Sequence, residues 1–112
     1  MYVYTIWIEA EEWAAGQWDI FDSNTDVIVK FGDGSQWTVT IYTYKNIMTL
    51  SEKNKNTGEQ LGGKYFWGKD MLLVEECSRE CIEEIIRHVM EEGEFQSIFR
   101  NCRNKRSGGE AE

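Results

Sequence analysis

The feature that most constrains the fold is a pair of alternating segments joined by a tight turn. Residues 27–31 read Val-Ile-Val-Lys-Phe, and residues 36–44 place Trp37, Val39 and Ile41 on one face of a period-two pattern. Between them, residues 32–35 read Gly-Asp-Gly-Ser and accept the positive φ angles of a short hairpin. The two segments therefore predict antiparallel strands that each turn one face toward a core.

Further strands are predicted on either side of this hairpin. Residues 17–22 alternate around Trp18 and Ile20, and the turn-forming residues 22–26 connect them to the hairpin. The apolar run at residues 71–74 predicts a buried fifth strand. The chain also begins with an alternating segment, whose residues on one face are Tyr2, Tyr4, Ile6 and Ile8.

The last third of the chain has the spacing of helices. Ser78 is a good N-cap for a helix that ends near Gly93, and residues 95–102 predict a second, shorter helix. Residues 45–58 predict a short helix that runs into a loop. The apolar face of the long helix consists of Cys81, Ile82, Ile85, Ile86, Val89 and Met90.

This order of elements predicts an α+β fold: an antiparallel sheet of about five strands with a C-terminal helix pair packed on one face. A length of 112 residues favours one domain, which we assign to residues 1–102, with a disordered or frayed tail at residues 103–112. The five tryptophans are more large aromatic side chains than one helix pair covers easily. The sheet therefore either curls or exposes part of its surface as a binding face.

The charge balance excludes several classes of partner. The chain has 20 Asp and Glu against 12 Lys and Arg, a net charge of −8, and residues 1–99 alone carry −10. Such a body repels phosphate backbones and anionic membranes, so we expect no nucleic acid and no membrane partner. Without an apolar run of the ~20 residues that span a membrane, and without a signal-peptide start, the chain is predicted to be soluble and cytoplasmic.

No motif in the chain predicts a metal, a cofactor or catalysis. Cys77, Cys81 and Cys102 lack the spacing of a zinc site, and the first two are expected to be buried thiols of a reducing compartment. The residues 22–26 start like a calcium loop, but Val27 stands where that loop requires glycine. The single histidine, His88, lies in the middle of the long helix. We therefore expect a protein that is not an enzyme.

A cluster of acidic residues near tryptophans predicts a protein partner. Residues 9–33 carry seven acids and one base, and Trp13 and Trp18 lie among them. Aromatic anchors surrounded by charge of one sign favour fast, salt-sensitive binding to a basic protein. Trp18 is expected in the core, whereas Trp13 and Trp67 are the better candidates for exposure. The predicted contact residues are Glu9, Glu11, Glu12, Trp13, Asp19, Asp22, Asp26 and Asp33.

Two alternatives remain open. The first is a small-ligand-binding or enzymatic domain with a pocket between the aromatic sheet face and the loop at residues 45–63, lined by Tyr44, Tyr65, Trp67 or Asp70. The second is a homodimer joined through an uncovered sheet face or an edge strand, which is compatible with either function.

The arrangement of motifs also resembles a known group of proteins. The resemblance rests on the first strand with Trp7, on residues 18–22, 29–37 and 65–67, and on the closing isoleucine-rich helix. Together, over about residues 1–100, they look like small bacterial proteins that are similar to immunity proteins of polymorphic toxin and contact-dependent inhibition systems. The resemblance implies a non-enzymatic cytosolic α+β protein that binds one toxin domain and blocks its active site. Its acidic residues would then oppose a cationic nuclease surface.

Overall fold

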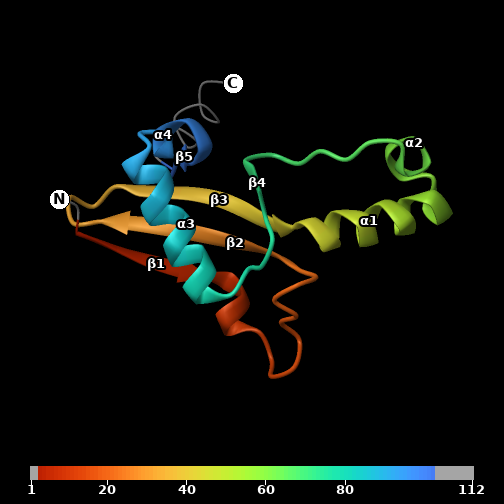
Figure 1. The fold of residues 1–112 in the computed structure, drawn as a ribbon, viewed down its shortest axis with the longest axis horizontal. Helices are drawn as coiled ribbons and strands as arrows, with labels where there is room; N and C mark the ends of the chain where they lie inside the picture. Colours follow the sequence, from red (N-terminus) through yellow and green to blue (C-terminus); the bar gives the residue numbers. More distant parts are fainter. Residues whose placement is uncertain (1–2, 103–112) are drawn as a thin grey trace.

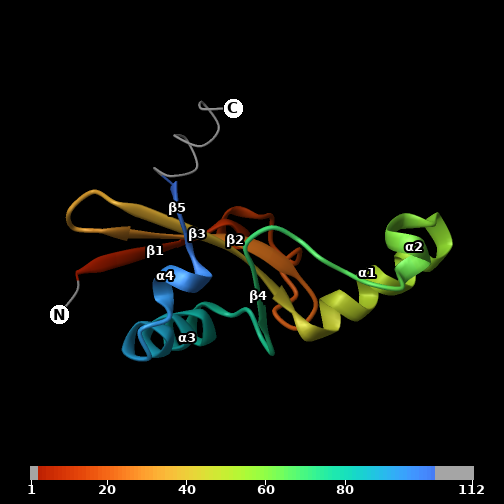
Figure 2. The same ribbon diagram turned by 90° about the horizontal axis from the view of Figure 1, so that it is seen from above.

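The computed structural model describes residues 3–102, and the tail predicted at residues 103–112 lies outside them. A five-stranded sheet has the helices α3 and α4 on one side. A helical arm, residues 44–69, projects beyond one end of the sheet (Figures 1 and 2). The predicted α+β class is thereby confirmed. The strands are β1 (Tyr4–Ile8), β2 (Asn24–Phe31), β3 (Gln36–Thr43), β4 (Met71–Val74) and β5 (Arg100–Asn101).

The predicted hairpin forms the centre of the sheet. The strand order is β1-β2-β3-β4, and β5 pairs with β3 beside β4. The β1–β2, β2–β3 and β3–β5 pairs are antiparallel, whereas β4 runs parallel to β3. Parallel pairing requires a long crossover, and the chain between β3 and β4 supplies it. In the hairpin turn, Gly34 has a φ of 91° and its N–H donates to the Phe31 carbonyl.

The core lies between the sheet and the C-terminal helices. Val27, Val29, Val39 and Ile41 alternate toward it along β2 and β3 and are fully buried. Helix α3 (Arg79–Glu91) covers them with an apolar face that includes Ile82, Ile86 and Val89, and the predicted Ser78 cap is confirmed because its side chain accepts from the Cys81 N–H.

The second C-terminal helix is shorter than predicted. Helix α4 (Phe95–Ile98) ends before Phe99, whose extended backbone leads into β5 instead of continuing to residue 102. Phe95 and Phe99 are both buried and stack with ring centroids 4.3 Å apart. Burying these two rings together bends the chain back toward the sheet, where it pairs with β3.

The helix predicted after β3 is longer than expected. Thr43 is the N-cap of helix α1 (Tyr44–Thr57), and its side chain accepts from the Asn46 N–H. Gly58, with a φ of 86°, is the C-cap. A short segment, α2 (Glu59–Gly63), reverses the chain, which then returns toward β4. The caps Thr43 and Gly58 directly flank α1. The helix therefore includes the polar residues before Gly58 that were expected to form a loop.

The strand predicted at residues 17–22 is wrong, because local hydrogen bonds close this segment into turns. After β1 the chain forms a 3-10 turn, η1 (Glu9–Glu12), and residues 13–23 form a loop. The Asp19 carboxylate accepts from the Phe21 N–H, and Ser23 Oγ donates to the Asp19 carbonyl. Trp18 Nε1 donates to the buried Cys77 Sγ at 3.3 Å, and the Cys77 N–H donates to the Ile20 carbonyl, so the loop is held against the segment that precedes α3.

Candidate functional site

Within residues 3–102, one face of the sheet has no helix packed on it. Figure 2 shows α3 and α4 on one side of the sheet and α1 beyond its end. The register places Trp7 beside Ile28 and Ile28 beside Thr38, with their side chains directed away from the core. The residues whose side chains share this direction form a surface that we name the open sheet face. They are Thr5, Trp7, Asn24, Asp26, Ile28, Lys30, Thr38, Thr40, Tyr42, Met71, Leu73 and Arg100.

Three carboxylates lie at the end of the open sheet face that contains Trp7. Trp7 Nε1 donates to Glu12 at 3.4 Å, and the Asp26 N–H donates to Glu9 at 3.4 Å. Thr40 Oγ1 donates to Asp26 at 2.8 Å. Within residues 3–102, no Lys or Arg forms an ion pair with any of these three carboxylates. We name Trp7, Glu9, Glu12 and Asp26 the acidic indole cluster, and its charge is available to a cationic partner.

Part of the open sheet face is covered by the segment that returns from the arm. The Phe66 ring meets the Tyr42 ring edge-on, with centroids 5.5 Å apart. Burial and the negative charge of Asp26 raise the pKa of Tyr42, so its hydroxyl stays protonated at neutral pH. Leu73 and Trp67 remain exposed beside this contact. The apolar part of the face thus continues from Trp7 toward the base of the arm.

Glu11 has a structural partner that sequence analysis did not find. Its carboxylate accepts from Arg79 Nε at 2.6 Å and from Arg79 Nη2 at 2.9 Å. Arg79 also donates to the Ile6 carbonyl on β1 and binds Glu83 one helical turn away. The Arg79 hydrogen bonds hold the pKa of Glu11 below its ordinary value. Glu11 therefore joins η1 to α3, away from the acidic indole cluster.

The remaining predicted acids lie at other places. Asp19 closes a turn in the loop at residues 13–23, and Asp22 accepts from Asn46 Nδ2 and Thr49 Oγ1 of α1, both at 2.9 Å. The Asn46 hydrogen bond lowers the pKa of Asp22. Asp33 lies in the hairpin turn, at the far end of β2 from Asp26, where it accepts from Ser35. The structure thus brings together three of the seven predicted acids.

The tryptophans are distributed differently from the prediction. Trp13, expected to be exposed, is partly buried against the core, as is Trp18. Trp67 is exposed to 65%, as predicted. The aromatic side chain among the three unpaired carboxylates is Trp7, which sequence analysis did not select. Its alternation with Ile6 and Ile8 was the signal, because Trp7 must then lie on the opposite face from those core residues.

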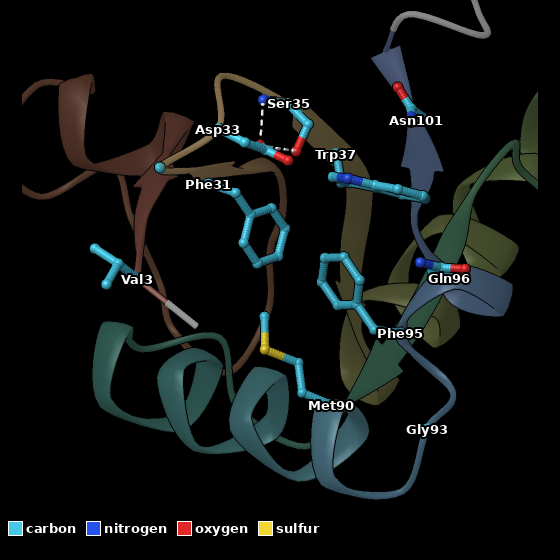
Figure 3. A pocket seen from close by; sticks show the side chains of 11 residues that line it. Val3, Phe31, Asp33, Ser35, Trp37, Met90, Gly93, Phe95, Gln96 and Asn101 are labelled. Atoms are coloured by element: carbon cyan, nitrogen blue, oxygen red, sulfur yellow. Dashed lines mark hydrogen bonds between the residues drawn. The ribbon is translucent and has the colours of Figure 1, made fainter. Parts of the chain in front are cut away.

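Three of the four residues of the alternative ligand site belong to the arm, and Asp70 directly follows it. Tyr44, Tyr65 and Trp67 are exposed, and the Asp70 carboxylate forms an ion pair with Arg100. None of them lines the pocket shown in Figure 3, a hollow of about 680 Å³ near the hairpin turn. That pocket has an aromatic wall and a polar rim, and its residues are Val3, Phe31, Gly32, Asp33, Ser35, Trp37, Met90, Gly93, Phe95, Gln96 and Asn101.

Two further features of the described residues bear on the site. Within residues 3–102, no group of three or more His, Cys, Asp or Glu side chains is arranged to hold a metal ion. Among the helices of the same residues, none combines the length and the apolar character needed to cross a membrane.

Comparisons of the chain with protein-family models, with curated proteins and with solved structures found no match in any of the three.

Proposed function

We propose that this chain is a non-enzymatic protein-binding module that engages a cationic protein through its open sheet face. The observation that carries the proposal is the acidic indole cluster, in which an exposed indole lies among three carboxylates without a cationic partner in the described chain. An aromatic anchor supplies contact area, and unpaired charge of one sign selects a partner of the opposite sign. The partner would therefore present an apolar hollow surrounded by Lys and Arg.

The charge outside the arm favours the same class of partner. Residues 1–43 carry seven acids and one base, and residues 70–102 carry nine acids and three bases. A surface potential of one sign steers an oppositely charged protein and raises its association rate, an effect that salt suppresses. The same potential repels nucleic acid, so a nucleic-acid partner is not part of the proposal.

An immunity-type inhibitor is the form of this function that the resemblance of the sequence implies. A toxin domain that acts on nucleic acid needs a cationic groove for the phosphates. A rigid acidic face with a projecting indole would occupy such a groove and exclude the substrate without any chemical step. The proposal places this inhibition in the cytoplasm, where a toxin domain of this class meets its substrate.

Charge reversal tests the proposal. The tagged protein is used to capture partners at low salt from a lysate of the cells that naturally express it, alongside the variant with Glu9→Lys and Glu12→Lys. A matched control carries Glu91→Lys and Glu92→Lys at the exposed end of α3, which changes the net charge equally. We expect a basic protein with the wild type and the control, released as salt rises, and its loss with the face variant. Equal capture by all three proteins would contradict the proposal.

A second candidate function is supported by the pocket in Figure 3. Its volume of about 680 Å³ lies in the range of small-molecule sites, and its lining combines the aromatic rings of Phe31, Trp37 and Phe95 with polar groups. Incubation with a metabolite extract, followed by ultrafiltration and mass spectrometry, tests it. A compound retained by the wild type and lost with Gln96→Trp, which narrows the pocket from its exposed rim, would support this function. Retention of no compound would exclude it.

A further inference from the structure

The arm formed by residues 44–69 projects from the end of the sheet. It contains α1, α2 and the returning segment, and Figures 1 and 2 show it extending beyond β3. The Cα radius of gyration is 15.4 Å, whereas a compact domain of this size has about 13 Å. Asp22 holds Asn46 and Thr49 at the start of α1, so the arm is anchored in this direction. It therefore cannot fold back onto its own sheet without breaking these bonds.

The arm exposes several large apolar side chains to solvent. Met48 and Leu61 are each exposed to 70%, although a projecting helix in a monomer would place polar residues at such positions. The aromatic residues of the same arm add to this surface. Its exposed large apolar side chains are Tyr44, Met48, Leu61, Tyr65 and Trp67. Exposed large apolar side chains on a projecting element suit contact with another surface.

The arm also has the opposite charge from the rest of the molecule. It carries five lysines and two glutamates, a net charge of +3, and all five lysines are exposed. The remainder of residues 1–102 carries sixteen acids and four bases, a net charge of −12. The lysines are Lys45, Lys53, Lys55, Lys64 and Lys69. A cationic arm and an anionic acidic indole cluster, at one end of the open sheet face, are thus present in one chain.

From these observations we infer that the chain forms a symmetric dimer in which the arm of each copy lies on the open sheet face of the other. The arm lysines then approach the acidic indole cluster of the second copy, and the exposed apolar side chains of the arm cover Ile28 and Leu73. Around a two-fold axis, the contact between an arm and a face occurs twice, so that both surfaces of both copies are occupied and the assembly is closed. Exposed aromatics near lysines also suit single-stranded nucleic acid, but the charge of −12 on the rest of the molecule opposes phosphate and attracts a second arm.

Sedimentation velocity of the purified chain tests the dimer without any other partner. At about 100 μM protein and low salt, a concentration that populates even a micromolar interface, we expect the wild type to sediment as a dimer that dissociates as salt rises. Met48→Ala with Trp67→Ala should give a monomer. Val3→Ala, which truncates an equally exposed apolar residue outside the arm, should leave the dimer intact. A wild-type monomer at low salt, or a dimer that survives the arm substitutions, would overturn the inference.

A charge swap identifies the two surfaces that meet. One variant carries Lys53→Glu and Lys55→Glu in the arm, and the other carries Glu9→Lys and Glu12→Lys on the face. Each variant alone should be monomeric, because like charges then meet in both contacts. Mixed in equal amounts, they should form a heterodimer, because each arm then meets a face of opposite charge. If the two variants remained monomeric in the mixture, this pairing would be refuted. Binding of a labelled oligonucleotide to the arm of the wild-type protein, in place of a second copy, would refute it as well.

The dimer and the proposed function are separable. The sedimentation experiments contain only this chain, so their outcome does not depend on whether a cationic partner exists. If both hold, the two ligands compete for the open sheet face, and a cationic partner should convert the dimer into a complex with one copy of each chain.

Discussion

Arg79 connects three elements through one guanidinium group. It binds Glu11 in η1 with two hydrogen bonds, Glu83 in α3 with one, and the Ile6 carbonyl of β1 with another. Because β1 is an edge strand, its outward carbonyls would otherwise be free to pair with another chain. The Arg79 contact occupies one of them. This edge is therefore a less suitable interface than the open sheet face.

Replacing Arg79 by methionine should lower the free energy of unfolding by about 1–2 kcal/mol, since it removes several charge-assisted hydrogen bonds from partly exposed groups. Arg87→Met on the same helix is the control, because the Arg87 side chain is exposed and has no ion pair among the described residues. Urea denaturation measures both variants. Equal stability of the two would show that the Arg79 contacts contribute nothing.

The Glu11 carboxylate should make part of the stability depend on pH. Its pKa in the folded protein lies below the ordinary 4.5, because Arg79 stabilises the charged form. This contribution is therefore complete above the unfolded pKa and is lost as the pH falls through the folded value. Glu11→Gln should destabilise the protein at neutral pH, and the difference from the wild type should shrink in acid. Urea midpoints across this range measure it; a difference that does not change with pH would contradict the assignment.

At the scale of elements, the joint between β3 and α1 determines where the arm points. Thr43 is fully buried, and its hydroxyl oxygen accepts from the N–H groups of Ser23 and Asn46. One side chain thus caps α1 and ties it to the loop before β2. Asp22 adds a second tie from the same loop to Asn46.

Thr43→Val keeps the shape of this side chain and removes its acceptor. Two N–H groups then lose their partner, and we expect a loss of about 1–3 kcal/mol in the free energy of unfolding. Thr57→Val, at the exposed end of the same helix, should cost much less. Thermal unfolding followed by circular dichroism compares the two, and an unchanged midpoint for Thr43→Val would show that the cap is dispensable.

The turn at the tip of the arm depends on one glycine. A Cβ atom on Gly63 would lie 2.4 Å from the Ser51 carbonyl oxygen, whereas one on Gly62 would meet no atom within 4 Å. Both residues have a positive φ, so Gly62→Ala is a matched control for backbone strain of about 1 kcal/mol. Gly63→Ala should cost clearly more and loosen the tip. Limited proteolysis of the arm measures this; equal cleavage of both variants would contradict the packing.

The elements that sequence predicted correctly are those whose pattern is local. The hairpin and α3 follow from alternation, periodicity and a capping serine within one segment each. The pattern around Trp18 and Ile20 was misleading, because these residues are held by Cys77, far away in the chain. The two-residue β5 and the parallel pairing of β4 likewise depend on contacts between distant segments.

The candidate site was predictable in composition but not in geometry. The acidic character of residues 9–33 was visible in the sequence. The sequence did not show that Arg79 binds Glu11 and that Asn46 binds Asp22, because these contacts form only in the folded chain. The alternation of Trp7 with Ile6 and Ile8 predicts its outward direction, but only the strand register places it beside Ile28 and near the three carboxylates. The Tyr44, Tyr65 and Trp67 side chains were selected for a pocket, and the structure instead places them on an exposed arm.

At the scale of the whole molecule, charge is divided between two parts of one chain. The arm is cationic and exposes large apolar side chains, and the rest of residues 1–102 is strongly anionic and has a sheet face without a helix in the described part of the chain. In a monomer, the apolar side chains of the arm and those of the open sheet face would both remain in contact with water. The molecule therefore suits association with other proteins, and we propose that the acidic indole cluster is its central contact.

The most direct test of this account is the kinetics of binding between the purified chain and the basic protein captured by it. Glu9→Lys with Glu12→Lys should slow association at least tenfold and flatten its salt dependence, because steering is lost. Trp7→Ala should mainly accelerate dissociation, because it removes the anchor. The control with Glu91→Lys and Glu92→Lys should change neither rate by as much. Unchanged association and dissociation rates for both face variants would show that the open sheet face is not the binding surface.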